Sequence, residues 1–380
     1  MLEKKFDDIR PYRDEEIPAA MQRIAESTSF PLLSSFVFPD EDIETVRQRV
    51  REYKTIEEFQ YGVMWYANNQ IIKRSTTGLT YDGLEKLDPQ KCYMYVSNHR
   101  DIMLDSSLMQ NILHDNGFPT TEITFGANLM QGELVIDIGK SNKMFRVERP
   151  GGSVREFYMK SLHLSEYMRH VITMKHQSVW IAQRNGRTKD GIDRTDQGII
   201  KMFGMSRTDD KIKSLAELNI VPVSVSYEWE SCDILKALEL YASELGPYIK
   251  KPGEDLNSIL TGIVQYKGHV HIHFCDVVTE ANLMQFDEST SNEFHRNVAQ
   301  LIDSRICSNY RLYPNNYIAH DLLHGNQKYV DKYTAQEKQQ FEHYMQKFRK
   351  YEDDCNIEHL IEIFLGIYAN PIDSKKEFSK

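Results

Sequence analysis

Residues 91–105 read KCYMYVSNHRDIMLD, and this stretch decides the fold. The apolar run at 91–97 is entered from the turn-forming Asp88-Pro89 and left at Asn98-His99, which predicts a short buried strand. Residues 102–113 follow it and have the character of a helix. A buried strand that leads directly into a helix is the repeating unit of α/β folds.

The same order of elements recurs further along the chain. Short apolar runs predict strands at 121–125, 144–147, 178–183, 220–227 and 269–274. Residues 153–176 are strongly periodic, and Ser153 and Glu156 have the spacing of a capping box, which predicts a long helix. We therefore predict an α/β fold with a central mixed sheet flanked by helices.

Helical segments are expected at both ends of the chain. Residues 1–80 have mostly helical character, and Thr76-Thr77-Gly78 and Tyr81-Asp82-Gly83 are turn signals at the end of this region. From about residue 282 the sequence becomes charged, Tyr-rich and helical again. These changes predict three parts: an N-terminal helical region at 1–80, a central domain at 81–281 and a C-terminal helical region at 282–380.

The composition is that of a globular chain with an uneven charge. The 380 residues include 46 Lys and Arg against 56 Asp and Glu, a net charge of −10, and 41% of the residues are apolar. This length is ample for a sizeable core, and the negative charge argues against a nucleic-acid partner. Between residues 140 and 213, however, sixteen Lys and Arg stand against eight Asp and Glu. That stretch is suited to meet an anionic substrate or an anionic membrane surface.

Cysteine usage and hydropathy indicate the compartment. The five Cys residues are widely spaced and form no C-x-x-C pair, so we expect reduced thiols rather than a disulfide framework or a zinc ribbon. No apolar run approaches the ~18–20 residues of a spanning helix, and the first residues lack the apolar region of a secretory signal. We therefore expect a cytoplasmic protein.

A His residue stands at the exit of the strand at 91–97. His99 is followed by Asp101 two residues later and by Asp105 six residues later. A neutral imidazole can take the proton of a hydroxyl group, and a carboxylate can orient that imidazole and stabilise its charged form. This arrangement of residues is suited to acyl transfer to a hydroxyl.

Basic residues stand at two further strand ends. Arg149 comes just before the start of the helix at 153–176, where backbone N–H groups favour an anion. Gly186 and Arg187 follow the strand at 178–183. Glycine permits close approach of the backbone to a ligand, and arginine can hold a phosphate through two hydrogen bonds.

Four short blocks, taken in order, resemble those of the glycerolipid acyltransferase superfamily, which includes glycerol-3-phosphate and 1-acylglycerol-3-phosphate acyltransferases. The matching residues are Asn98-His99, Val147-Glu148-Arg149, Gly186-Arg187 and Val221-Pro222-Val223. The resemblance spans roughly residues 85–280, and it implies that the central domain at 81–281 is an acyltransferase domain.

The resemblance implies an enzyme of phospholipid synthesis. It would move a fatty acyl group from acyl-CoA or acyl carrier protein to a hydroxyl of a glycerol-3-phosphate or 1-acylglycerol-3-phosphate type acceptor. His99 would be the general base and Asp105 its orienting acid, while Arg149, Gly186 and Arg187 would bind the acceptor phosphate. No metal and no bound cofactor is expected. Together with the basic stretch, these roles suggest peripheral attachment to the anionic inner face of the membrane.

Two positions depart from the family pattern. Five residues, rather than four, separate His99 from Asp105, so either the loop absorbs the extra residue or Asp101 takes the role of Asp105. Asn185 stands where the third block usually has Glu. Two alternatives therefore stay open: a non-catalytic lipid-binding protein of the same fold, and a thioester hydrolase.

Residues 268–274 read GHVHIHF and place three imidazoles on one face of a predicted strand. No acidic cluster accompanies them in the sequence, and ligands at i and i+2 do not by themselves converge. We therefore expect a half-exposed strand with its His residues on the outer face.

Overall fold

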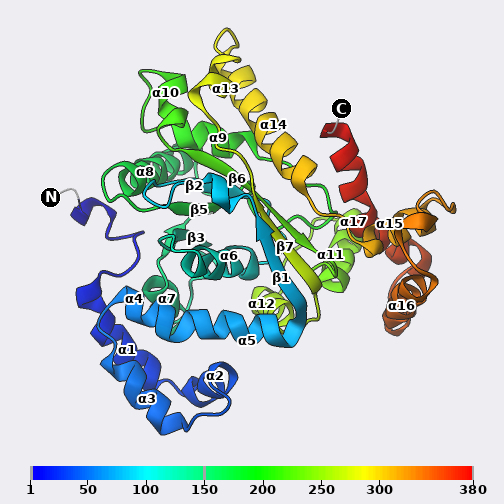
Figure 1. The fold of residues 1–380 in the computed structure, drawn as a ribbon, viewed down its shortest axis with the longest axis horizontal. Coiled ribbons are helices and arrows are strands. Elements are labelled where there is room, and N and C mark those ends of the chain that lie inside the picture. Colours follow the sequence, from blue (N-terminus) through cyan, green and yellow to red (C-terminus); the bar gives the residue numbers. More distant parts are fainter. Residues whose placement is uncertain (1–2, 149–150, 379–380) are drawn as a thin grey trace.

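The computed structural model describes residues 3–148 and 151–378. Within this part of the chain, seven strands form one sheet in the order β1-β7-β6-β2-β5-β3-β4 (Figure 1). The strands are β1 (Thr76–Asp82), β2 (Met94–Ser97), β3 (Glu122–Gly126), β4 (Met144–Val147), β5 (Val179–Ala182), β6 (Ile220–Tyr227) and β7 (Gly268–Phe274). β6 and β7 are antiparallel and the other neighbouring pairs are parallel. The prediction of an α/β fold with a central mixed sheet is confirmed.

Helices cover both faces of the sheet and form both ends of the described chain (Figure 1). Up to the middle of the chain they are α1 (Ile17–Glu26), α2 (Phe30–Val37), α3 (Ile43–Glu52), α4 (Ile56–Phe59), α5 (Trp65–Ser75), α6 (Leu104–Asp115), α7 (Glu133–Ser141) and α8 (Val154–Thr173). The later ones are α9 (Gln197–Gly204), α10 (Lys211–Ala216), α11 (Asp233–Leu245), α12 (Glu254–Val264), α13 (Glu280–Met284), α14 (Ser291–Asn309), α15 (Pro314–Leu323), α16 (Ala335–Met345) and α17 (Ile357–Phe378). A π-helical turn, Gln60–Met64, joins α4 to α5.

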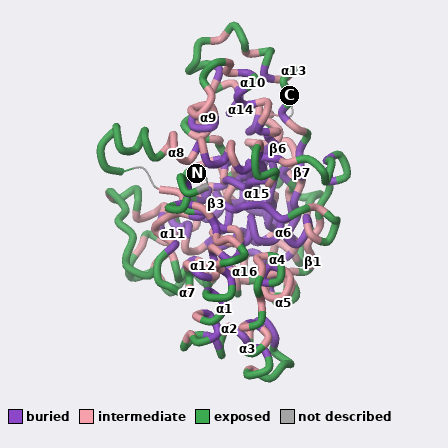
Figure 2. The backbone as a smooth tube through the Cα atoms, turned by 90° about the vertical axis from the view of Figure 1, so that its left-hand side faces the viewer, coloured by how far each residue is buried: buried purple, intermediate pink, exposed green. Residues whose placement is uncertain are grey.

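Alternation along the strands divides the core into two layers. In β2, Met94 and Val96 pack with α8, α9 and α14 on one face, while Tyr95 packs with α6 on the other. Every residue of β6 is buried. Figure 2 shows the buried backbone concentrated in the sheet and α6, with the exposed residues in the outer loops and helix ends. Because helices cover both faces of the central strands, ligands can reach those strands only at their ends.

Two further hydrophobic clusters hold the terminal helices. The first joins α1, α2 and α3 to α7, and an ion pair between Arg23 and Asp137 of 2.6 Å ties α1 to α7. The second joins α15, α16 and α17 to α11 and to Trp229. No helix in residues 3–148 and 151–378 has both the length and the apolar character needed to cross a lipid bilayer.

The predicted elements of the central region are present with small shifts in their ends. β4 has the predicted bounds, and α8 begins with the predicted capping box of Ser153 and Glu156. The turn prediction at Thr76-Thr77-Gly78 was wrong, because residues 76–82 form β1, which pairs in parallel with β7. At the second turn signal, Tyr81-Asp82-Gly83, the chain bends only at Gly83, where φ is +80°. The partner strand lies far along the chain, so no local pattern indicates the pairing. The expected domain boundary between residues 80 and 81 falls within β1.

Candidate active site

Asn98 extends the sheet beyond the end of β2. Its side chain accepts a hydrogen bond from the backbone N–H of Val225 (2.7 Å) and donates one to the backbone carbonyl of Val225 (3.0 Å). The amide side chain therefore satisfies both backbone groups of a β6 residue that has no partner in β2. This contact places the next residue, His99, at the carboxyl end of β2.

His99 and Asp105 are paired. Nδ1 of His99 lies 2.9 Å from Oδ2 of Asp105, and the His99 ring meets Trp180 edge to face at a centroid distance of 5.9 Å. Within the described residues, nothing hydrogen-bonds to the second ring nitrogen, Nε2, and the side chain retains an exposed fraction of 14%. The imidazole is therefore held at one nitrogen and open at the other.

Asp105 is fully buried but well supplied with donors. The backbone N–H groups of Arg100 (2.6 Å) and Asp101 (2.9 Å) donate to Oδ2, and the Tyr227 hydroxyl donates to Oδ1 (2.8 Å). Burial, followed by the charge of Asp105, raises the pKa of Tyr227 well above its usual value, so this hydroxyl keeps its proton. These donors compensate the carboxylate for the water it has lost.

The extra residue between His99 and Asp105 is absorbed before α6 begins. Oδ1 of Asp101 accepts hydrogen bonds from the backbone N–H groups of Met103 and Leu104, both at 2.8 Å, at the start of the helix. Its Oδ2 accepts a hydrogen bond from Ser231. Of the two carboxylates, Asp105 is thus the one that contacts His99, and Asp101 accepts hydrogen bonds at the start of α6 instead. The catalytic role of the pair stays a prediction.

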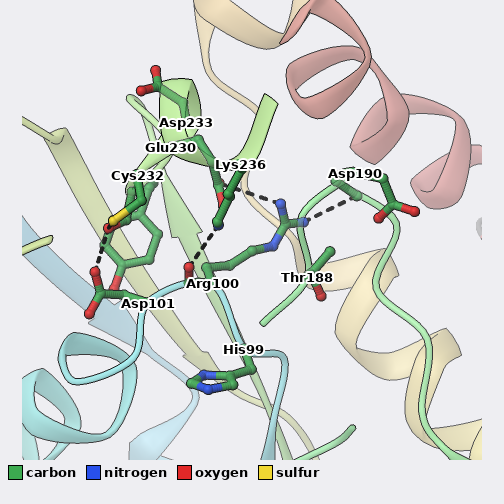
Figure 3. A network of polar contacts seen from close by, with 12 residues as sticks. His99, Arg100, Asp101, Thr188, Asp190, Glu230, Cys232, Asp233 and Lys236 are labelled. Atoms are coloured by element: carbon green, nitrogen blue, oxygen red, sulfur yellow. Dashed lines mark hydrogen bonds and ion pairs between the residues drawn. The ribbon is translucent and has the colours of Figure 1, made fainter. Parts of the chain in front are cut away.

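Arg100 points away from His99 into a buried network of charges (Figure 3). Its guanidinium contacts Asp193 (2.6 Å) and Glu230 (3.4 Å), and Lys236 donates to Glu230 (2.5 Å) and to the backbone carbonyl of Arg100 (2.7 Å). Burial opposes the charge of Arg100, but Asp193, Tyr310 and Glu230 outweigh it and raise its pKa well above the usual value. These contacts hold the backbone of Arg100, the residue that follows His99, in place.

The loop after β5 lies against His99. The backbone N–H of Thr188 donates to the His99 carbonyl oxygen (2.7 Å), and the Thr188 hydroxyl donates to Asp193 (2.8 Å). Gly186 is exposed and has a φ of +77°, a conformation that favours glycine. Asn185 is exposed beside it.

Arg187 is buried, and its Nη1 has no hydrogen-bond partner within the described residues. A buried guanidinium nitrogen without a partner is costly. It is therefore a candidate to receive an anionic ligand.

The other predicted basic residues give a mixed outcome. Arg149 lies outside the described residues, so its place beside His99 stays a prediction. Cations of the basic stretch are often paired with carboxylates, as Arg146 is with Glu148 and Lys189 is with Glu239. The charge excess of residues 140–213 is therefore partly neutralised.

Several residues around His99 were not found from the sequence. Asp193 accepts hydrogen bonds from the side chains of Asn98 (2.9 Å), Arg100 and Thr188. Glu230 forms ion pairs with both Arg100 and Lys236. A lone carboxylate in a polar stretch has the same local pattern as any surface residue, so no sequence signal marked these two groups. Only their burial against Arg100 distinguishes them.

Comparisons with known proteins give little further information. No family model and no curated protein matches the chain. Among solved structures, the chain is similar to the 1-acyl-sn-glycerophosphate (LPA) acyltransferase PlsC from Thermotoga maritima. The similarity covers 75% of this chain and 91% of that chain, at 14% identity and a TM-score of 0.36. At that level the likeness carries no argument about activity, which has to be argued from the site.

Proposed function

We propose that the chain is an O-acyltransferase of glycerolipid synthesis. It transfers a fatty acyl group from acyl-CoA or acyl carrier protein to a hydroxyl of a glycerol-3-phosphate or 1-acylglycerol-3-phosphate type acceptor. The observation that carries the proposal is the His99–Asp105 pair, in which Nδ1 is anchored at 2.9 Å and Nε2 is left open. The extra residue between His99 and Asp105 was an argument for the non-catalytic alternative. Because His99 and Asp105 contact each other in spite of this residue, that argument no longer supports the alternative.

His99 acts as a general base in this reaction. Its Nδ1–H donates to Asp105, so the lone pair of Nε2 accepts the proton of the acceptor hydroxyl. The hydroxyl oxygen attacks the thioester carbon, the new C–O ester bond forms and the C–S bond breaks. The proton then passes from His99 to the leaving thiolate, and no acyl-enzyme is formed.

The acceptor phosphate is the proposed ligand of Arg187. The unpartnered Nη1 of this buried side chain supports an anionic ligand, and Gly186 beside it leaves the backbone open to close approach. Arg149 is proposed to share the phosphate on the strength of the sequence resemblance alone. None of these roles requires a metal ion or a bound cofactor.

We propose that the acyl chain of the thioester donor lies in an anionic membrane surface that α12 contacts. Leu256, Leu260 and Val264 follow one another at a spacing of four residues, and each is more than half exposed. They form an outward apolar stripe. Lys250 and Lys251 are exposed just before it, and Lys250 is ion-paired with Asp255 at 2.5 Å. An exposed apolar stripe on a helix is suited to contact with the interface of a bilayer, and Lys251 adds a positive charge beside it.

Thiol release from long-chain acyl-CoA, with and without glycerol-3-phosphate, tests the reaction. His99→Ala should reduce acceptor-dependent release about 10²–10⁴-fold without changing acceptor affinity, because a general base acts mainly in the transition state. Arg187→Ala should raise the acceptor KM more than it lowers kcat. His359→Ala is the control, because this exposed side chain is likewise paired with a carboxylate, Glu244, at 2.6 Å.

Three results would contradict the proposal. Wild-type release without any acceptor would indicate a hydrolase. Release that survives His99→Ala would remove the general base from the mechanism. Phosphate-lipid binding without any turnover would indicate the non-catalytic alternative.

A further inference from the structure

The histidine-rich strand β7 is the neighbour of β1, which is the edge strand of the sheet. In their parallel register, Thr80 is opposite His271 and Asp82 is opposite His273. Val270, Ile272 and Phe274 belong to the hydrophobic core, so the imidazoles lie on the other face of the strand, as the alternation predicted. The pairing of the two strands thus brings Asp82, from a distant part of the chain, to these histidines.

Three possible ligand groups converge at this place. Oδ1 of Asp82 lies 3.4 Å from Nε2 of His271 and also contacts Nδ1 of His273. One ligand atom from each of Asp82, His271 and His273 lies within 4.8 Å of the others. His271 is buried and His273 is half-buried, whereas the side chain of Asp82 is 59% exposed, so an ion could enter from solvent beside Asp82.

Thr80 orients the His271 ring. Its hydroxyl lies 2.9 Å from Nδ1 of His271 and 2.8 Å from Nε2 of His269. The hydroxyl has one proton, so it can donate to His269 while it accepts from Nδ1–H of His271. In that arrangement the lone pair of His271 Nε2 faces the Asp82 carboxylate. Two electron-rich atoms at 3.4 Å are stabilised by a cation between them.

We propose that Asp82, His271 and His273 form a binding site for a divalent transition-metal ion such as Zn²⁺. Two imidazoles and one carboxylate are a ligand set that zinc accepts, with a further coordination position left for water. Ligands about 2.0–2.1 Å from a tetrahedral ion are about 3.3 Å apart, which is close to the distance between Asp82 and His271. Thr80 takes the place of the outer hydrogen-bond partner that fixes a metal-binding imidazole.

Charged groups around the site set its selectivity. The direct contact between His273 and Asp82 must open to admit the ion, and the side chain of Asp82 is exposed enough to move. Arg311, from the segment before α15, contributes positive charge near His269 and His271 and weakens cation binding. The site therefore depends on strong imidazole coordination rather than on charge, which favours Zn²⁺ over Mg²⁺ or Ca²⁺.

A second cluster provides a competing explanation for any metal binding. His320, His324 and Asp373 also place ligand atoms within 4.8 Å of one another. In that cluster both His324 and Asp373 are exposed, whereas in the cluster between β1 and β7 only Asp82 is exposed. We therefore favour the site between β1 and β7, and the experiment separates the two.

Zinc affinity of the full-length chain, measured in competition with a chromophoric chelator, tests the proposal. Asp82→Asn and His273→Gln should each lower the affinity at least about 100-fold, since loss of an outer partner alone costs about 10–100-fold. His359→Gln is the matched control, because His359 lies between two carboxylates, Glu244 and Glu362, and is exposed. His324→Gln reports on the second cluster. Both control variants should bind as the wild type does.

Cobalt substitution gives a second readout. The wild-type chain with Co²⁺ should show the visible absorption of a four-coordinate ion, and His273→Gln should lose it while its circular dichroism spectrum stays unchanged. If Asp82→Asn does not fold, His273→Gln decides alone. Unchanged zinc affinity in His273→Gln, or an affinity lost only in His324→Gln, would overturn the proposal. None of these outcomes depends on acyl transfer.

Discussion

Asp303, on α14, is a buried carboxyl group that accepts hydrogen bonds from the backbone N–H (2.7 Å) and the hydroxyl (2.6 Å) of Thr195. Burial raises its pKa from 3.8 to about 6, although the bonds from Thr195 oppose this shift. Between these two values the folded chain holds a proton that the unfolded chain has released. The contribution of Asp303 to the free energy of unfolding therefore falls as the pH rises through this window.

Asp303→Asn should remove this pH dependence, because an amide keeps an oxygen that can accept from Thr195 but does not titrate. Above pH ~6 we expect the variant to be more stable than the wild type by roughly 1–3 kcal/mol, and the difference should vanish toward pH ~4. Urea unfolding across this range measures it. Asp276→Asn is the control, because a hydrogen bond from Lys86 lowers the pKa of Asp276. Parallel pH profiles of Asp303→Asn and the wild type would contradict the assignment.

Among the helices, α12 packs closely against the loop after His99 because it has a glycine, Gly262, at the contact. Gly262 lies on the inner face of α12, where a Cβ atom would overlap Oδ2 of Asp101 and approach Ser231. Asp101 in turn holds the first turn of α6, on which Asp105 is carried. The position of α12 and the geometry of the candidate site are therefore linked through one glycine.

Gly262→Ala should destabilise the chain by about 1–3 kcal/mol, because overpacking outweighs the gain in helix propensity. Gly366 is a helix-interior glycine of α17 whose nearest neighbour to an added Cβ, Asn370, lies 3.7 Å away. Gly366→Ala should therefore stabilise by about 0.5–1 kcal/mol. Guanidinium unfolding of both variants provides the comparison. Equal effects of the two substitutions would show that the contact with Asp101 does not constrain α12.

At the scale of the whole molecule, the apolar stripe of α12 and the candidate site lie on connected elements. The inner face of α12 meets Asp101, and its outer face presents Leu256, Leu260 and Val264. A bilayer against that outer face would hold acyl chains next to the helix that borders the His99 loop. This arrangement gives the proposed membrane attachment a specific surface.

Leu260→Glu should therefore reduce binding to vesicles of phosphatidylglycerol and phosphatidylcholine at least about tenfold, since a charge replaces an apolar contact. Met284→Glu, on α13, is the control, because this side chain is 60% exposed and lies outside the stripe. Vesicle co-sedimentation at low and high salt measures both variants and separates the apolar from the electrostatic contribution. Equal loss in both variants would show that α12 is not the contact surface.

Elements that depend on neighbours along the chain could be predicted from sequence patterns. The strands at β2, β4 and β6 and the capping box of α8 follow from apolar runs and from residues three positions apart. His99 was singled out because it stands at a strand exit and in the first of four ordered blocks, which are patterns along the chain. The segment at β1 was misread, because its Gly and Asp residues are turn formers and its stability comes from the distant strand β7.

Which charged groups meet depends on contacts between distant parts of the chain, and no local pattern predicted them. Asp105 rather than Asp101 faces His99 because the residues between them turn before α6 begins, and spacing alone leaves that choice open. Asp193 against Arg100, and Asp82 against His271, are brought together by a loop and by strand pairing. The physical reason is that periodicity and propensity act over a few residues, whereas burial of a charge depends on a partner that the fold delivers from elsewhere in the chain.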